Sequence, residues 1–263
     1  MKLILMLFIL SSVLFSKVYY AKVEPYEIRN ISSEVSGLVV FVDKDMLGKK
    51  LSSKPYIRID SIVDTKDLKY TKEKITYVKN TIKSNEKVLA NLQELLKRKR
   101  LNYDKVKVLK IKSSVEKDRE FYELISSENQ FLNTQKEIYS LKTQLADLNL
   151  RAISLKRSIN DKNLKAKGLV LYSWSVEVGQ VVGMSTPLAK VADISRALLT
   201  IYLDEEDLVE VSKKSIYLNG VKTEYNISRV LNIADEKNIS KYMAQIIIKS
   251  PKIFSKLVQV ELK

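Results

Sequence analysis

The stretch Gly37-Leu38-Val39-Val40-Phe41 returns later in the chain as Gly168-Leu169-Val170-Leu171-Tyr172. A further glycine follows each copy, Gly48 after the first and Gly179 after the second, and each copy then reaches a proline. Short apolar runs bounded by glycine and proline are typical of β-strands. About a hundred residues separate the two copies. The repeat therefore predicts one small β domain whose halves are split by a long insertion.

The two halves of this β domain are predicted at 17–60 and 164–194. Each half ends near an acidic residue, Asp60 in the first and Asp193 in the second. The first half includes an N-terminal strand near 20–28, which we expect to pair with the C-terminal part of the chain.

The insertion, at 61–163, is predicted to be helical. Residues 65–160 contain neither glycine nor proline, the two poorest helix formers. Apolar residues recur there at every seventh position, and heptads sustained over this length predict coiled-coil helices. The first run is Leu68, Ile75, Ile82, Leu89 and Leu96, and the second is Leu124, Phe131, Ile138, Leu145, Ala152 and Ile159. Asn85 and Lys99 interrupt the companion positions of the first run.

The two runs are predicted to form one antiparallel hairpin within the chain. Ser113-Ser114-Val115-Glu116 has the pattern of a capping box, which starts a second helix shortly after the first has ended. A short connection makes consecutive helices antiparallel neighbours. The tip is predicted at about 109–114. Each helix of about 45 residues would extend roughly 65–70 Å at 1.5 Å per residue. The alternative, one continuous helix that dimerises, does not explain this break.

Residues 195–263 are predicted to form a small β-barrel, because several short strand-like runs are separated by turns. These runs lie at 198–203, 215–218, 227–233, 242–248 and 258–262. The predicted fold class is therefore α+β with several domains. A long coiled-coil hairpin is inserted in a split β domain, and a small barrel follows.

The composition argues against an enzyme. Histidine and cysteine are both absent from the 263 residues, which removes the commonest general base, the commonest metal ligand and the thiol nucleophile. We therefore expect no catalytic residue, no cofactor and no metal site. The formal charge is +15, but the lysines are interleaved with acidic residues along the helices, and no nucleic-acid module is present. We expect a solvated basic surface and no nucleic-acid partner.

Residues 1–16, MKLILMLFILSSVLFS, have the pattern of a signal peptide. Lys2 supplies a positive start, and the apolar run that follows is too short to span a bilayer comfortably. Cleavage is predicted after Ser16, which places the mature chain in the periplasm. The alternative is an uncleaved anchor, which would hold the chain at the inner membrane.

Residues 37–60 and 168–193 resemble the two halves of a lipoyl, or biotinyl, domain. In such carrier domains a hairpin between the halves bears the modified lysine, and here the helical insertion takes that place. A lipoyl-like β-sandwich opened by a helical hairpin, preceded by a signal peptide and followed by a barrel, resembles the periplasmic adaptors. These proteins are also called membrane fusion proteins, or the HlyD-like family. The segment 201–211 is similar to the family's entry into its barrel.

The resemblance implies an adaptor that links an inner-membrane transporter to a TolC-like outer-membrane channel in the export of small molecules. It also implies self-association into a ring, as a hexamer or a trimer of dimers. A proton-driven pump of the resistance-nodulation-division type is favoured. The alternative within the family is an adaptor of an ABC or type I secretion exporter, and a different class is a structural coiled-coil protein without transport. Many adaptors add a membrane-proximal domain built from both chain ends, and we expect this chain to lack it.

The resemblance also implies a channel-contacting tip. Family members that serve proton-driven pumps often carry Arg, Leu and Ser there at fixed spacing, and Ser113-Ser114 is similar to the serine end of this motif. Family spacing then puts Val106 at the Leu position and Asn102 at the Arg position, while a shortened loop would use Leu109 and Lys105. Ser113 is equally explained as a plain helix cap.

Other residues near the tip also allow two interpretations. Leu109 and Ile111 lie beyond the regular heptads and are either tip contacts or the last packed turn of the first helix. The basic residues that crowd the distal part of the first helix are either a solvated face or a docking surface for an acidic channel rim or a neighbouring adaptor. These residues are Lys97, Arg98, Lys99, Arg100, Lys105, Lys107, Lys110 and Lys112.

Overall fold

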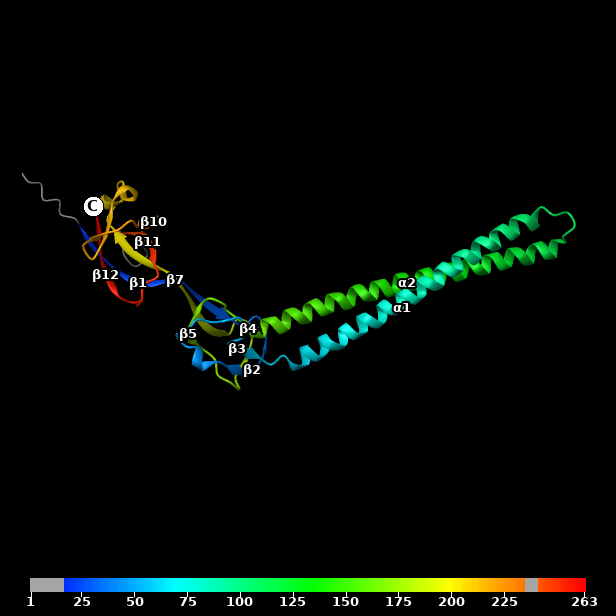
Figure 1. Cartoon of the computed structure of the whole chain (residues 1–263), viewed down its shortest axis with the longest axis horizontal. Helices are drawn as coiled ribbons and strands as arrows, with labels where there is room; N and C mark the ends of the chain where they lie inside the picture. The colour runs from blue at the N-terminus through cyan, green and yellow to red at the C-terminus, as the bar shows by residue number, and fades with distance from the viewer. Residues whose placement is uncertain (1–16, 235–240) are drawn as a thin grey trace, which may run out of the picture. The chain divides into compact units, whose positions relative to one another are not determined.

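The computed structural model describes residues 17–234 and 241–263, so the predicted signal peptide at 1–16 lies outside the described residues. The chain forms two compact units (Figure 1). One, the hairpin unit, combines Glu34–Val40 with Arg58–Leu164. The other, the β unit, combines the described residues up to Ser33 with Phe41–Ile57 and the described residues of Lys165–Lys263.

The hairpin unit is built on two long helices, α1 (Ile62–Lys107) and α2 (Ser114–Asp161). They have 46 and 48 residues and run side by side, cyan and green in Figure 1. Their buried apolar side chains are members of the predicted heptad runs and form the seam between the helices: Ile82, Leu96, Leu124, Ile138 and Ala152. The predicted intramolecular hairpin is confirmed, because each apolar stripe is buried against the other helix.

The two interruptions of the seam have different surroundings. Lys99 is half-buried and pairs with Glu123 of α2. Asn85 keeps a buried side-chain nitrogen that has no hydrogen-bond partner among the described residues. A buried polar group of this kind costs stability, and its best-attested use in coiled coils is to fix the register of the helices.

Short strands lie at the base of the hairpin. These are β2 (Gly37–Val42), β3 (Ile57–Ile59) and β4 (Asn163–Leu164), which lie in a four-stranded sheet of order β4-β3-β2-β6. The Ile59 N–H donates to the Lys162 carbonyl (2.8 Å), and the Asp60 N–H donates to the Leu38 carbonyl (2.8 Å). Lys162 also pairs with Asp64. Both ends of the hairpin are therefore tied to the first half of the split domain.

The β unit is organised around two long strands, β1 (Val18–Ser32) and β7 (Pro187–Leu203). They pair antiparallel at the centre of a sheet of order β10-β11-β7-β1-β12-β8-β9, with β5 (Val170–Trp174) also on β7. The remaining strands are β6 (Val181–Val182), β8 (Ile216–Leu218), β9 (Val221–Lys222), β10 (Ile227–Ala234), β11 (Tyr242–Lys249) and β12 (Leu257–Leu262). Short helical turns lie at Lys44–Met46, Glu205–Leu208 (α3) and Val211–Lys213.

The core of the C-terminal part lies between these strands. Leu199, Ile201, Ile216, Ile246 and Val260 are completely or almost completely buried there and belong to one apolar cluster. The predicted N-terminal strand joins this part, because β1 pairs with β12 from Val18 to Lys22. The predicted boundary between 194 and 195 falls inside the continuous strand β7. The predicted α+β class is confirmed, with a helical hairpin and β-sandwich and half-barrel domains, where a small β-barrel was predicted for the C-terminal part.

The two copies of the repeat lie in related but unequal surroundings. Gly48 and Gly179 both have positive φ, +71° and +90°, which favours glycine. Asp60 accepts the N–H of Ile62 (2.9 Å), and Asp193 accepts that of Ser195 (2.8 Å), so each copy ends in the same local turn. Burial differs, however. In the first copy Val39 is buried, whereas in the second copy the buried residue is Leu171, one position further along the repeat.

Candidate functional site: the hairpin tip

The first helix ends at the tip because its last residues leave the heptad pattern. Val108 is the C-cap of α1, and the Leu109 N–H donates to the Val106 carbonyl (3.1 Å) to close a final turn. A connection of a few residues, ending at Ser113, then leads to α2.

The second helix begins with the predicted capping box. The Glu116 N–H donates to Ser113 Oγ (3.3 Å), and the Ser113 N–H donates to Glu116 Oε2 (3.0 Å). Lys112 Nζ donates to Glu116 Oε1 (2.8 Å), so that one carboxylate holds both the connection and the start of the helix. These contacts satisfy backbone donors that a helix start otherwise leaves free. The tip is therefore a defined turn.

The structure places the four predicted tip residues in two kinds of surroundings. Val106 is half-buried at the end of the α1–α2 seam, whereas Leu109, Ser113 and Ser114 are exposed. Ser113 is engaged as the cap of α2. Asn102 and Lys105, the two candidates for the family's Arg position, are both exposed on α1.

The end of the hairpin also exposes aliphatic residues that lie outside the predicted heptads. Val108, Ile111 and Val115 are 70%, 89% and 75% exposed, and Leu109 is 40% exposed. Of these, sequence reasoning pointed to Leu109 and Ile111 but missed Val108 and Val115. The sequence could have indicated these two residues, because both are valines outside the heptads in a strongly charged segment. We call Val108, Leu109, Ile111 and Val115 the apolar tip.

An aromatic cluster lies below the tip, on both helices. The rings of Tyr103 and Phe121 have centroids 5.6 Å apart, and those of Phe121 and Tyr122 are 6.0 Å apart. Lys107 Nζ lies 5.7 Å from the centroid of the Tyr103 ring. Such tilted ring contacts add to the apolar packing of the seam and hold the helices together where the heptads end.

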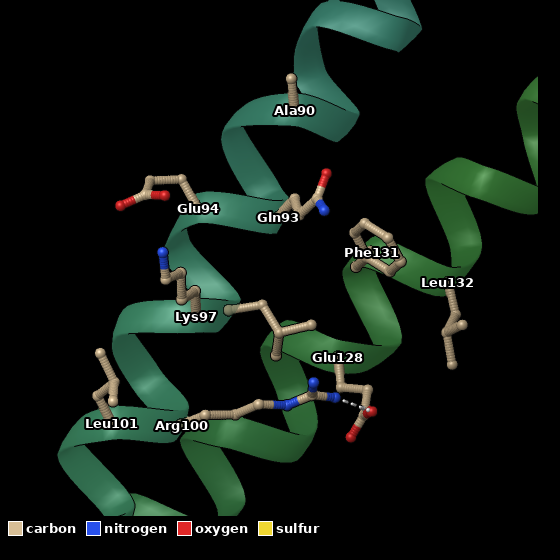
Figure 2. A pocket seen from close by; sticks show the side chains of 10 residues that line it. Ala90, Gln93, Glu94, Lys97, Arg100, Leu101, Glu128, Phe131 and Leu132 are labelled. Atoms are coloured by element: carbon tan, nitrogen blue, oxygen red, sulfur yellow. Dashed lines mark hydrogen bonds and ion pairs between the residues drawn. The ribbon is translucent and has the colours of Figure 1, made fainter.

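Many of the distal basic residues are paired within the hairpin. Arg100 contacts Glu128 of α2 (2.7 Å, Figure 2), and Lys99 contacts Glu123. Arg98 and Lys107 pair along their own helix with Glu94 (3.3 Å) and Asp104 (2.5 Å). Exposed pairs of this kind contribute little to stability. They nevertheless reduce the charge that this face presents to a partner.

The capping carboxylate makes a testable pH prediction. The hydrogen bond from Lys112, followed by those from the Ser113 backbone and hydroxyl, lowers the pKa of Glu116 from 4.5 to about 2. Because the pKa of Glu116 is lowered in the folded state, its ionised carboxylate stabilises the fold. This stabilisation is complete above the ordinary pKa and is lost as the pH falls through about 2. We expect the Glu116 carboxyl carbon to titrate with a midpoint clearly below 4.5 in an NMR experiment.

The matched control for this prediction is Glu116→Gln. Glutamine can still accept the Ser113 N–H, but it cannot titrate, so the chemical shift of the Ser113 amide should lose the acid dependence that Glu116 causes. A Glu116 midpoint at the ordinary value would show that the Lys112 contact is absent in solution.

Within 17–234 and 241–263, no cluster of three or more acidic side chains is placed to hold a metal ion. Over the same residues, no helix combines the length and the apolar character needed to cross a membrane.

The sequence itself matches no protein-family model and no curated protein. Solved structures are similar in fold. The MacA structure from Actinobacillus actinomycetemcomitans has a TM-score of 0.71 at 15% identity, with 94% of this chain and 78% of that chain covered. A MacA-MexA chimera with the α-hairpin domain of Pseudomonas aeruginosa MexA has a TM-score of 0.56 at 16% identity and covers 94% and 81%.

A third similar structure is the membrane fusion protein Spr0693 from Streptococcus pneumoniae R6. Its TM-score is 0.53 at 12% identity, and the match covers 94% of this chain and 99% of that one. At these identities the likeness concerns the fold. The chain therefore shares its fold with these three structures, which include a membrane fusion protein.

Proposed function

We propose that this chain is a periplasmic adaptor that links an inner-membrane transporter to a TolC-like outer-membrane channel in the export of small molecules. The observation that carries the proposal is the hairpin itself. It is a long, stiff pair of helices inserted in a small β domain, and it ends in four exposed aliphatic side chains. A closed hairpin has no need of such residues for its own stability, and exposed apolar side chains gathered at one end are typical of an interaction site.

In this proposal the apolar tip and the exposed Ser113 and Ser114 contact the helical end of the channel, by the same side-chain interdigitation that forms the seam. The half-buried Val106 supports the tip from below. Several copies associate into a ring, as a hexamer or a trimer of dimers. The chain acts without catalysis, cofactor or metal. It is exported to the periplasm by its N-terminal segment, and a proton-driven pump is the favoured transporter.

A photo-crosslinking amino acid at Ile111 tests the channel contact in cells. We expect it to capture an outer-membrane protein that mass spectrometry identifies as a TolC-like channel. The same amino acid at Thr143, an exposed position in the middle of α2, serves as the control and should capture none. An inner-membrane partner with an ATP-binding cassette would replace the proton-driven pump in the proposal. Absence of any channel crosslink, together with unchanged efflux after deletion of the protein, would instead support a structural coiled coil.

A further inference from the structure

The tripeptide Asn-Ile-Ser occurs three times in the chain, at 30–32, 226–228 and 238–240. Asparagine followed two residues later by serine or threonine, with no proline between them, is the acceptor sequence for N-linked glycans in exported proteins. The third copy lies outside the described residues. The structure therefore places two candidate acceptors, Asn30 and Asn226, and their surroundings differ.

Asn226 lies in the irregular connection between β9 and β10, directly before the first residue of β10. Its two neighbours in the chain, Tyr225 and Ile227, pack against the apolar core of the C-terminal part. Successive side chains of an extended segment point to opposite sides, so the residues that alternate with these two point outward. Glu224, Asn226 and Ser228 are accordingly exposed. The acceptor amide and the serine hydroxyl therefore both lie on the solvent side of the segment.

The segment around Asn226 is held loosely. The Asn226 side chain makes no hydrogen bond with any other residue in the described parts of the chain. The Ser228 hydroxyl accepts the N–H of Ile247 from β11 (3.2 Å), and the pairing of β10 with β11 shifts its register directly at this point. The end of a strand opens locally at a lower cost than its centre. The segment can therefore enter the groove of an enzyme while the apolar core stays folded.

The strand β10 is also the terminal strand of its sheet, which has the order β10-β11-β7-β1-β12-β8-β9. An enzyme can approach it from the side that no described strand of this sheet covers. Further along this edge, Leu231 and Ile233 are 40% and 78% exposed. Exposed apolar edges tend to pair with other chains, and a bulky hydrophilic glycan at the start of the strand opposes such pairing.

Asn30 is exposed as well, so exposure alone does not distinguish the two asparagines. It lies within β1, opposite Lys190 of β7, in a continuous antiparallel register. The strand β1 lies between β7 and β12 in the sheet order. Releasing the backbone there would break hydrogen bonds in the strand pair around which the β unit is organised. Asn30 is therefore the poorer acceptor, although its tripeptide is identical.

A second difference is the residue two positions before the asparagine. It is Glu224 before Asn226, but Ile28 before Asn30. Glu224 forms no ion pair with the other described residues, so its charge is available to a partner. Its carboxylate lies on the same side of the extended segment as the acceptor amide, where a basic side chain of an enzyme can bind it. Glu224 therefore favours Asn226 over Asn30.

We propose that Asn226 carries an N-linked glycan, transferred from a polyprenyl-diphosphate-linked oligosaccharide by a membrane transferase. The amide nitrogen attacks the anomeric carbon of the first sugar, and the new carbon–nitrogen bond forms as the bond from that carbon to the diphosphate oxygen breaks. The amide gives one proton to a base of the transferase, and the polyprenyl diphosphate leaves with the electron pair. The step needs no oxidant or reductant. The modification rests on the export in the proposed function but does not depend on the adaptor role.

Trypsin cuts the chain so that the three tripeptides fall in separate peptides, 30–44, 223–229 and 238–241. The full chain is purified from the cells that naturally make it and digested, and the peptides are analysed by mass spectrometry. We expect peptide 223–229 to carry a sugar on Asn226 and peptide 30–44 to be unmodified. Because peptide 238–241 is separate, a sugar on it cannot be mistaken for one on Asn226.

Two variants of the serine provide the matched control. Ser228→Ala removes the hydroxyl and should abolish the modification, whereas Ser228→Thr keeps the acceptor sequence and should preserve it. Glu224→Gln should lower the modified fraction of peptide 223–229 about tenfold, because a neutral group replaces the carboxylate in the contact with the transferase. An unchanged fraction in Glu224→Gln would overturn the selective role of Glu224.

An unmodified peptide 223–229 would overturn the proposal, and so would a sugar on Asn30 alone. Equal modification of Asn30 and Asn226 would overturn the selection of the acceptor by its place at the sheet edge. Cell fractionation separates a failure of the site from a failure of export. A chain recovered from the periplasm without the sugar would overturn the glycosylation site and leave export intact. A chain recovered from the cytoplasm would overturn both.

Discussion

Aspartate at both Val108 and Ile111 is expected to reduce the recovery of the outer-membrane channel with this protein by about a hundredfold or more. These side chains are 70% and 89% exposed at the apolar tip. Central apolar contacts of an interface are each worth about 2 kcal/mol, and every 1.4 kcal/mol corresponds to about tenfold in affinity. Aspartate removes the apolar contact and adds a charge that the interface would have to desolvate. Recovery is measured by crosslinking in cells followed by purification of the tagged chain.

The control for this variant keeps the apolar character of the tip. Val108→Ile with Ile111→Leu should retain nearly all of the channel recovery. Neither position belongs to the α1–α2 seam, so circular dichroism should show the same helix content in both double variants. Undiminished recovery with the aspartates would mean that the apolar tip does not contact the channel.

Gly37→Ala is expected to lower the free energy of unfolding by about 1–3 kcal/mol, the range for overpacking a well-filled core. A Cβ at Gly37 would lie 2.7 Å from Cγ2 of Ile59, closer than real side chains approach. Ile59 is 1% exposed and β-branched, so its methyl group has little freedom to move away. Gly37 therefore begins β2 as glycine because strand β3 packs against its backbone. Chemical denaturation followed by circular dichroism measures the change.

Two comparisons make the interpretation of this variant specific. At Gly183 an added Cβ would find its nearest atom at 4.0 Å, so Gly183→Ala should change stability far less. In an Ile59→Ala background, which removes the clashing methyl group, Gly37→Ala should cost clearly less than it does alone. Equal costs in both backgrounds would contradict the close approach as the cause.

The heptads predicted the hairpin correctly for a simple reason. A helix must bury its apolar stripe, and two stripes of matching length in one chain can bury each other through a short turn. The capping box at Ser113 was likewise readable, because it depends on residues only three positions apart. Interactions between residues that are close in the chain can be predicted directly from the sequence.

Other features depend on which surfaces remain uncovered after folding. Ile125, Leu132 and Tyr139 each directly follow a residue of the heptad runs, and only the folded hairpin shows that they remain exposed. The same holds for Val108 and Val115 at the tip. Their exposure follows from how the two helices face each other, which heptad positions alone do not specify.

The sequence by itself determined the split β domain, the helical insertion, its turn at Ser113 and the strands of the C-terminal part, because each depends on local spacing. Tertiary structure decided how the two repeat copies differ. Gly37 is needed where Ile59 packs against it, whereas Gly168 adopts a φ of +91°. Val39 is buried in one copy and Leu171, one position later in the repeat, is buried in the other. Matching residues of the two copies therefore differ in burial and in backbone conformation. The side of a strand that is covered depends on neighbours distant in the sequence, which no local pattern specifies.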